Sequence, residues 1–239
     1  MIPKILHYCW FGRGEMPPLA KDCIASWHKY MPDWEYRLWN EDNFDLELNI
    51  YAKEAYEAGK YAFVSDFVRL WALEHEGGLY LDTDVMVFRP FDNLLAYKAF
   101  AGFEGSKHQP IGTCVMASEA HGEWVTEMLN AYRDRHFVGA DGIFDLTTNV
   151  LFITAIMASK GFKQNGAEQD YSDLHVFPTE FFSPRQTTGE YLRRDYTYCD
   201  HKGMASWDEA SRSWKHSLLG LFGERTRIRL IKLKRKLFG

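Results

Sequence analysis

The chain has 239 residues and an ordinary globular composition, with 46% hydrophobic and 26% charged residues. These values exclude a disordered chain and a membrane bundle, and the length suits one large domain with a sizeable core. The net charge of −5 conceals a basic tail: residues 224–239 carry seven Lys or Arg against one Glu, which leaves −11 for the remainder. Because so acidic a body repels a phosphate backbone, we expect no nucleic acid partner.

The first part of the chain alternates between strand and helix patterns. Apolar or alternating residues predict strands at 2–10 and 34–38, on either side of a helix pattern at 18–30. A second helix is predicted over residues 61–76, and Gly77-Gly78 supplies its stop signal. This order of strand, helix and strand predicts an α/β domain.

Two acids interrupt the apolar strand pattern that follows these glycines. Asp82 and Asp84 lie between Leu79-Tyr80-Leu81 and the run of residues 85–88, and burying them there is costly unless they have a function. They share one side of the pleat or flank a turn, so both carboxylates can converge on one hard cation. Magnesium and manganese are the ions that such a site prefers. A D-x-D alone often marks a solvated turn, but this apolar setting favours the functional interpretation.

Asp66 and Arg69 are three residues apart on the preceding helix. At this spacing they share one helix face and can approach the same ligand. Two structural alternatives compete with a functional role. The two residues can form a simple surface ion pair, or Ser65 and Asp66 can cap the start of the helix.

The remainder of the chain contains further elements and a different tail. Strands are predicted at 99–103 and 111–117, and helices at 120–133 and 145–158. From residue 178 to about 207 the pattern is irregular and aromatic, as expected of segments that line a site. From residue 218 apolar residues step by three or four among Lys and Arg, which predicts a basic amphipathic helix. We expect a domain at 1–215 and a tail at 216–239.

Three interpretations of this tail stay open: a solvated helix packed on the body, a helix docked on an anionic membrane surface, and a helix for a partner protein. The four cysteines show no paired spacing, so we expect reduced thiols. The N-terminal apolar run is too short for a signal peptide and no stretch of 18 apolar residues occurs. We therefore expect a cytoplasmic protein, peripheral on the inner face of the membrane if the tail docks there.

Several blocks together resemble one enzyme family. The run Y-A-F-V-S-D-F-V-R-L-W followed by H-E-G-G-L-Y-L-D-T-D-V resembles glycosyltransferase family 32 and the related clostridial toxin glucosyltransferases. I-P-K-I-L-H-Y-C-W and S-W-x-x-x-x-P-D-W-E-Y-R-L-W resemble the opening strands and helix of that family. F-P-T-E-F-F-S-P and T-Y-C-D-H-K-G-M-A-S-W resemble two of its C-terminal blocks. The resemblance extends from residue 2 to about 207 and is loose over 105–175.

The resemblance implies a GT-A fold, which is a Rossmann-like mixed central sheet flanked by helices. It also implies a retaining, Mn²⁺- or Mg²⁺-dependent transfer of a hexose or N-acetylhexosamine in surface polysaccharide synthesis. The donor is expected to be a nucleotide sugar, a UDP-sugar before GDP-mannose, and the acceptor a glycan or a lipid-linked glycan. The implied roles are catalysis by Asp66, Arg69 and Asp82; donor binding by Trp10, Ser65, Asp82, Ser206 and Trp207; and metal binding by Asp84, His201 and Asp82.

Structural roles compete with some of these assignments, and the chain departs from the family at two places. Trp10 suits a core aromatic and His201 a structural histidine. Lys202 stands where the family often has a second histidine, and Thr147-Thr148-Asn149 stands where many members have Thr-Gly-Pro. We therefore leave the acceptor residues unassigned.

Two other functional classes remain as alternatives. A metal-dependent nucleotidyltransferase also uses paired acids, but the chain has no Gly-rich phosphate loop and no third acid near the pair. A non-enzymatic carbohydrate-binding module would be an exported all-β domain, whereas the predicted pattern is α/β.

Overall fold

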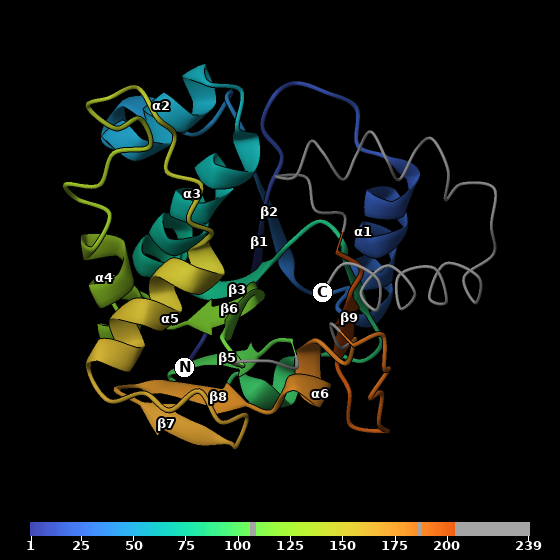
Figure 1. Ribbon diagram of the computed structural model, residues 1–239. Coiled ribbons are helices and arrows are strands. Elements are labelled where there is room, and N and C mark those ends of the chain that lie inside the picture. Colours follow the sequence, from blue (N-terminus) through green and yellow to red (C-terminus); the bar gives the residue numbers. More distant parts are fainter. Residues whose placement is uncertain (106–108, 186–187, 204–239) are drawn as a thin grey trace, which may run out of the picture.

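The computed structural model describes residues 1–105, 109–185 and 188–203 (Figure 1). Its centre is a seven-stranded mixed sheet in the order β2-β1-β3-β6-β5-β8-β7. The strands of this sheet are β1 (Ile5–Cys9), β2 (Glu35–Trp39), β3 (Gly78–Leu81), β5 (Ala99–Phe103), β6 (Ile111–Ser118), β7 (Gln169–Tyr171) and β8 (Leu174–Phe177). β1 runs parallel to both β2 and β3, whereas β6 is antiparallel to β3 and β5.

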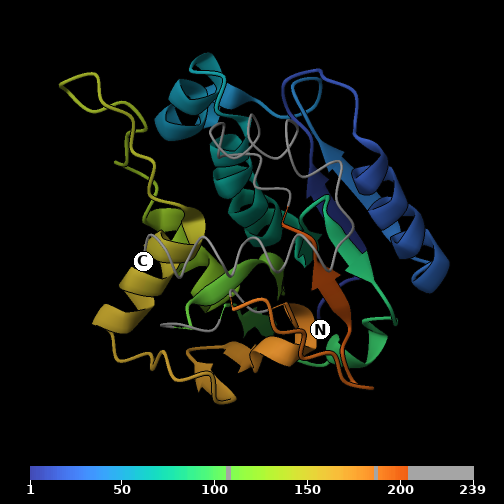
Figure 2. The same cartoon turned by 45° about the vertical axis from the view of Figure 1, so that its right-hand side comes forward.

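Helices cover both faces of this sheet, and each face has its own hydrophobic core. The helices of the first face are α2 (Ile50–Glu57), α3 (Tyr61–Glu76), α4 (Glu123–Asn130) and α5 (Asn149–Ser159), and those of the second are α1 (Pro18–Tyr30) and the short α6 (Thr179–Phe182). Figure 2 shows α3 and α1 on opposite sides of the parallel strands β1 and β2. Two 3₁₀ turns, η1 (Leu46–Leu48) and η2 (Asp92–Leu94), complete the helical segments.

A sharp connection between α3 and β3 brings the acid pair to the sheet. Gly78 has φ +117°, and a Cβ there would lie 2.5 Å from the carbonyl oxygen of Ile5 on β1. Only glycine allows this backbone conformation and this approach. The Gly-Gly signal therefore both ends α3 and sets β3 beside β1.

The alternative in which Asp82 and Asp84 share one side of a continuous strand is wrong, because the acids separate two strands. β3 ends at Leu81, a turn follows in which Val85 N–H donates to the Asp82 carbonyl at 3.0 Å, and the chain continues as β4 (Val85–Val87). β4 leaves the main sheet and pairs antiparallel with β9 (Cys199–His201). The alternative in which Asp82 and Asp84 flank a turn is confirmed.

The other element predictions are largely confirmed. The helices predicted at 120–133 and 145–158 are shorter than expected, and the capping alternative for Ser65 and Asp66 is wrong because α3 already begins at Tyr61. Besides the two 3₁₀ turns, five elements were not predicted, namely α2, β7, β8, α6 and β9. The amphipathic tail from residue 218 and most of the predicted unit 216–239 lie outside the described residues, as does the end of the domain predicted at 1–215.

All four cysteines are free and buried, as expected of reduced thiols. Of the helices in the described part of the chain, none combines the length and the apolar character that crossing a membrane requires. The prediction of an α/β domain with a mixed central sheet flanked by helices is confirmed.

Candidate active site

The predicted site residues gather where parallel strands end. β1 leads directly into Trp10 and β3 into Asp82, and because β1 and β3 are parallel, both residues lie at the same edge of the sheet. Such a carboxyl edge is where open α/β sheets bind their ligands. Residues predicted from separate motifs therefore converge on one edge.

An ion network joins helix α3 to this edge. Arg69 Nη2 lies 3.0 Å from Asp66 Oδ1 and 3.2 Å from Asp82 Oδ1. Tyr80 on β3 donates its hydroxyl to the same Asp82 oxygen at 2.9 Å. Asp66 and Arg69 are buried, so the alternative of a surface ion pair is wrong. We call Asp66, Arg69 and Asp82 the sugar-side cluster.

Every nitrogen of the Arg69 guanidinium has a partner within the protein. Its Nε donates to the carbonyl of Ser65 at 3.1 Å and its Nη1 to the carbonyl of Thr113 at 2.6 Å, while Nη2 meets the two carboxylates. The guanidinium also lies 4.7 Å from the centre of the Tyr80 ring. With all its nitrogens engaged, Arg69 fixes the directions of Asp66 and Asp82.

Burial and charge shift the ionisation of this cluster. Burial raises the pKa of Asp66 to about 6, with the Asp82 carboxylate adding to the rise and Arg69 opposing it. The backbone N–H of Asn149 donates to Asp66 Oδ2 at 3.2 Å, which favours the charged form. Burial lowers the pKa of Arg69, but the nearby Asp82, Tyr80 and Asp66 reverse this and hold it well above its ordinary value. One guanidinium thus serves two carboxylates.

Asp84 and His201 form a second group beside the first. The pairing of β4 with β9 sets Val85 opposite His201, so His201 Nε2 comes within 3.3 Å of Asp84 Oδ1. Lys202 N–H donates to the carbonyl of Asp84 at 3.0 Å, which extends the pairing past the strands. Burial lowers the pKa of His201, but Cys114 and Asp84 outweigh burial and raise it well above its ordinary value.

Asp82, Asp84 and His201 together form a possible set of metal ligands, which we call the metal-side cluster. Their ligand atoms all lie within 4.8 Å of one another. Two carboxylates and one imidazole suit Mn²⁺ or Mg²⁺, which prefer hard oxygen ligands and accept a substrate phosphate as a further one. The donor set therefore fits the cation that the sequence predicted, and Asp82 belongs to both clusters.

Two further residues that were predicted to bind the nucleotide-sugar donor lie near this edge. The Trp10 indole Nε1 donates to the Gly14 carbonyl at 2.6 Å, which fixes a half-buried ring beside the end of β1. Ser65, on α3, donates its hydroxyl to the carbonyl of Tyr61 at 3.2 Å. Ser206 and Trp207, which were predicted to close over the diphosphate, lie outside the described residues.

Glu104, Cys114 and Asn149 lie in this region and were not predicted as site residues. Glu104 follows the fully buried strand β5 directly, and its ligand atom lies within 4.8 Å of those of Cys114 and His201. Burial raises the pKa of Glu104. An acid after an apolar strand is the signal that revealed Asp82, so the same argument could have found Glu104. Asn149, which contacts Asp66, gives no comparable signal.

The sequence of this region matches a known family. Residues 17–101 match the family described as "Glycosyltransferase sugar-binding region containing DXD motif". The matched range contains Asp66, Arg69, Asp82 and Asp84. The predicted resemblance to DXD-containing glycosyltransferases is thereby confirmed.

Curated relatives give the same result over part of their length. "Mannosyl phosphorylinositol ceramide synthase SUR1" of Saccharomyces cerevisiae is 31% identical over 116 residues, which cover 47% of this chain and 29% of the relative. "Inositol phosphoceramide mannosyltransferase 2" of Schizosaccharomyces pombe is 29% identical over 131 residues, covering 51% and 35%. The chain therefore spans about a third of the length of these two relatives.

A solved structure shares the fold. The protein titled "PaToxG Glycosyltransferase" superposes with a TM-score of 0.52 and 16% sequence identity, covering 67% of this chain and 70% of that one. At this identity the likeness concerns the fold alone. The predicted GT-A class is confirmed.

Proposed function

Because the chain contains the DXD-bearing sugar-binding region of glycosyltransferases, we propose that it moves a hexose or N-acetylhexosamine from a nucleotide sugar to a glycan or lipid-linked acceptor. The observation that carries the proposal is the convergence of Asp82, Asp84 and His201 within 4.8 Å at the carboxyl edge of the sheet. A nucleoside diphosphate presented to that edge meets metal ligands on one side and the sugar-side cluster on the other.

The metal-side cluster is proposed to hold Mn²⁺ or Mg²⁺ through Asp84, His201 and Asp82. A divalent cation bound there supplies the positive charge that neutralises a departing diphosphate. His201 and Asp84 come from β9 and the β3–β4 turn, so the pairing of β4 with β9 holds the two ligands together.

The sugar-side cluster is proposed to orient the transferred sugar. Asp66 and Asp82 offer carboxylate oxygens to its hydroxyls, while Arg69 acts through them as a positioning residue because its nitrogens already have partners. Two carboxylates beside the anomeric centre also favour an oxocarbenium-like transition state. No protein nucleophile is required if the acceptor attacks on the leaving-group face, so we propose a retaining transfer.

The remaining donor contacts are proposed from the predicted roles. Trp10 offers the face of a fixed ring to the nucleobase, and Ser65 lies on the same helix as Asp66 and Arg69. A UDP-sugar is our first candidate donor. Two relatives bear names of mannosyl-transferring enzymes that act on inositol phosphoceramide, which supports testing GDP-mannose second and a lipid-linked acceptor alongside a glycan.

Manganese-dependent hydrolysis of a panel of nucleotide sugars tests this proposal. Released sugar supports it, released pyrophosphate supports the nucleotidyltransferase alternative, and binding without a product supports the carbohydrate-binding module.

Asp84→Asn should lower hydrolysis of the preferred donor by about a thousandfold, which corresponds to about 4 kcal/mol of transition-state stabilisation. The reason is that the variant removes one charged metal ligand while keeping the size of the side chain. Asp92→Asn, at a surface acid paired with Lys4, is the matched control and should retain activity. A folded Asp84→Asn protein with wild-type hydrolysis would contradict the site.

We propose that the basic tail binds the protein to the cytoplasmic face of an anionic membrane. Residues 224–239 carry the excess of positive charge noted above, and such segments bind anionic leaflets on the cytoplasmic side. Removal of residues 216–239 should therefore abolish co-sedimentation with phosphatidylserine vesicles at low salt. Unchanged co-sedimentation after truncation would refute a role for the tail in membrane binding.

A further inference from the structure

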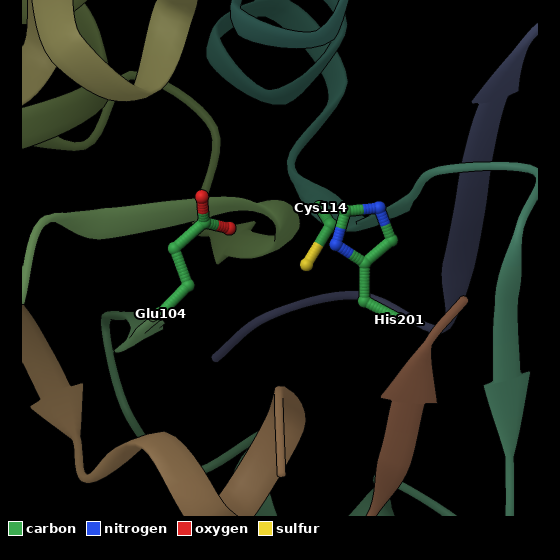
Figure 3. A group of neighbouring side chains, drawn as sticks. All are labelled: Glu104, Cys114 and His201. Carbon is green, nitrogen blue, oxygen red and sulfur yellow. The ribbon is translucent and has the colours of Figure 1, made fainter. Parts of the chain in front are cut away.

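A second group of metal-ligating side chains lies beside the metal-side cluster and was not assigned above. Glu104, Cys114 and His201 each offer one ligand atom, and these atoms all lie within 4.8 Å of one another. Figure 3 shows the Glu104 carboxylate, the Cys114 sulfur and the His201 ring turned toward a common space. The three come from different elements, since Glu104 follows β5, Cys114 is in β6 and His201 ends β9.

The surrounding backbone gives Glu104 the room to lie there. A Cβ on the neighbouring Gly112 would lie 3.3 Å from a Glu104 carboxylate oxygen and 3.1 Å from the Gly102 carbonyl. Cys114 is 2% exposed, and its sulfur lies 3.6 Å from the hydroxyl of Ser183. A hydroxyl at that position can donate to a thiolate and support it as a metal ligand.

The chemistry of this set differs from that of the metal-side cluster. Thiolate, imidazole and carboxylate are the ligands of tetrahedral zinc sites, which leave a fourth position open when the protein supplies three. Mn²⁺ and Mg²⁺ prefer oxygen ligands and gain little from a thiolate. Two neighbouring ligand sets thus favour two different classes of cation.

His201 is common to both sets. A neutral imidazole has one free nitrogen lone pair, because the other nitrogen carries a proton, so His201 can serve one cation at a time. Two dications at such close range would also repel each other. Occupation of one site is therefore expected to exclude the other.

We propose that Glu104, Cys114 and His201 form a zinc site whose occupation withdraws His201 from the Asp82–Asp84 pair and so weakens binding of the hard donor cation. Binding converts the Cys114 thiol to a zinc-bound thiolate, and its proton passes to solvent. The open fourth position takes water. Zinc is then an inhibitor that acts through a shared ligand.

Cobalt and zinc binding to the full chain test this site without any enzyme assay. Co²⁺ should produce a thiolate-to-cobalt charge-transfer absorption in the wild-type protein, and Zn²⁺ should abolish it. Cys114→Ser should lose that absorption and bind Zn²⁺ more weakly by at least about tenfold, the smallest loss that even an outer partner of a metal ligand causes.

Glu104→Gln is the second variant and should weaken Zn²⁺ binding while keeping the thiolate absorption. Cys23→Ser, at another buried free cysteine on α1, is the matched control and should behave as wild type.

Competition between the two cations tests the shared histidine. Zn²⁺ should release protein-bound Mn²⁺, seen as the electron paramagnetic resonance signal of free Mn²⁺, and Cys114→Ser should bind Mn²⁺ normally but resist this release by at least about tenfold. Absence of the thiolate absorption, or Zn²⁺ affinity that survives Cys114→Ser and is lost with Asp84→Asn, overturns the proposal. If zinc binds through Cys114 but no nucleotide sugar is hydrolysed, the proposed function fails and the zinc site stands.

Discussion

The sugar-side cluster and the metal-side cluster share Asp82 but are built in different ways. Asp66 and Arg69 lie on the 16-residue helix α3. Arg69 contacts Asp82, which follows β3, and the carbonyl of Thr113 in β6. Asp84 and His201 are held by two strands of three residues each, in a separate two-stranded sheet. Asp66 and Arg69 are buried, whereas the side chains of the shared Asp82 and of His201 are 25% and 29% exposed.

This difference separates stability from chemistry. A buried guanidinium between two carboxylates is part of the folded core, so its loss leaves charges that the interior cannot solvate. A half-buried histidine on a short strand contributes less to the fold and can be devoted to a ligand. We therefore expect mutations of the sugar-side cluster to act on the free energy of unfolding and those of the metal-side cluster to act mainly on metal affinity.

The largest effect on stability is expected from Arg69→Leu. It leaves the buried Asp66 and the partly buried Asp82 without their cation, and breaking a buried pair costs about 3–5 kcal/mol. Urea denaturation measures the loss. Arg37→Leu is the control, because Arg37 is 44% exposed and pairs with Glu35 and Glu76 at the surface, where an ion pair contributes at most about 1 kcal/mol. Equal losses in the two variants would remove the proposed distinction.

A smaller effect is expected from the raised pKa of Asp66. Its folded pKa of about 6 lies above the ordinary aspartate pKa of 3.8, so the folded state binds this proton more tightly than the unfolded state. The resulting stability is fully present below about pH 4 and is lost as pH rises through 6. The gap of about two units corresponds to roughly 3 kcal/mol.

The pH dependence is measured as a difference between wild type and Asp66→Asn, so that groups common to both proteins cancel. From pH 4 to pH 7 the wild type should lose stability relative to the variant, by an amount approaching that value. A difference that stays flat over this range would show that Asp66 is already ionised at low pH, as a strongly paired carboxylate would be.

Local signals predicted only part of the sugar-side cluster. Helical spacing placed Asp66 and Arg69 on one face of α3, but it left a surface ion pair as an alternative, and their role came from the family resemblance. The apolar run after Gly77-Gly78 singled out Asp82 as an acid that interrupts a strand pattern. Spacing alone could not show that the pair is buried or that Arg69 also bonds Thr113, since these contacts depend on packing against β6.

In the metal-side cluster the apolar strand pattern revealed Asp82 and Asp84, whereas His201 was less accessible to sequence reasoning. The departure of β4 from the main sheet and its pairing with β9 are non-local, and no periodicity announces a three-residue strand. His201 was named only because a block around it resembled a family, and Glu104 was missed although it follows a buried strand. Contacts between segments distant in sequence are what composition and spacing cannot reveal.

The smallest effect is expected from His201→Gln, and it tests the other half of the comparison. Glutamine keeps a polar side chain but removes the imidazole nitrogen, so one metal ligand is lost while Asp82 and Asp84 remain. We expect Mn²⁺ affinity in the presence of a nucleoside diphosphate to fall about 10- to 100-fold, or about 1.4–2.7 kcal/mol, by titration calorimetry. His136→Gln is the matched control, since His136 is 56% exposed and bonds Glu54 outside both clusters.

In His201→Gln the free energy of unfolding should change by about 1 kcal/mol or less, well below the loss in Arg69→Leu. If His201→Gln instead destabilises the fold as much as Arg69→Leu and leaves Mn²⁺ affinity intact, His201 is a structural residue and the metal is held by the carboxylates alone.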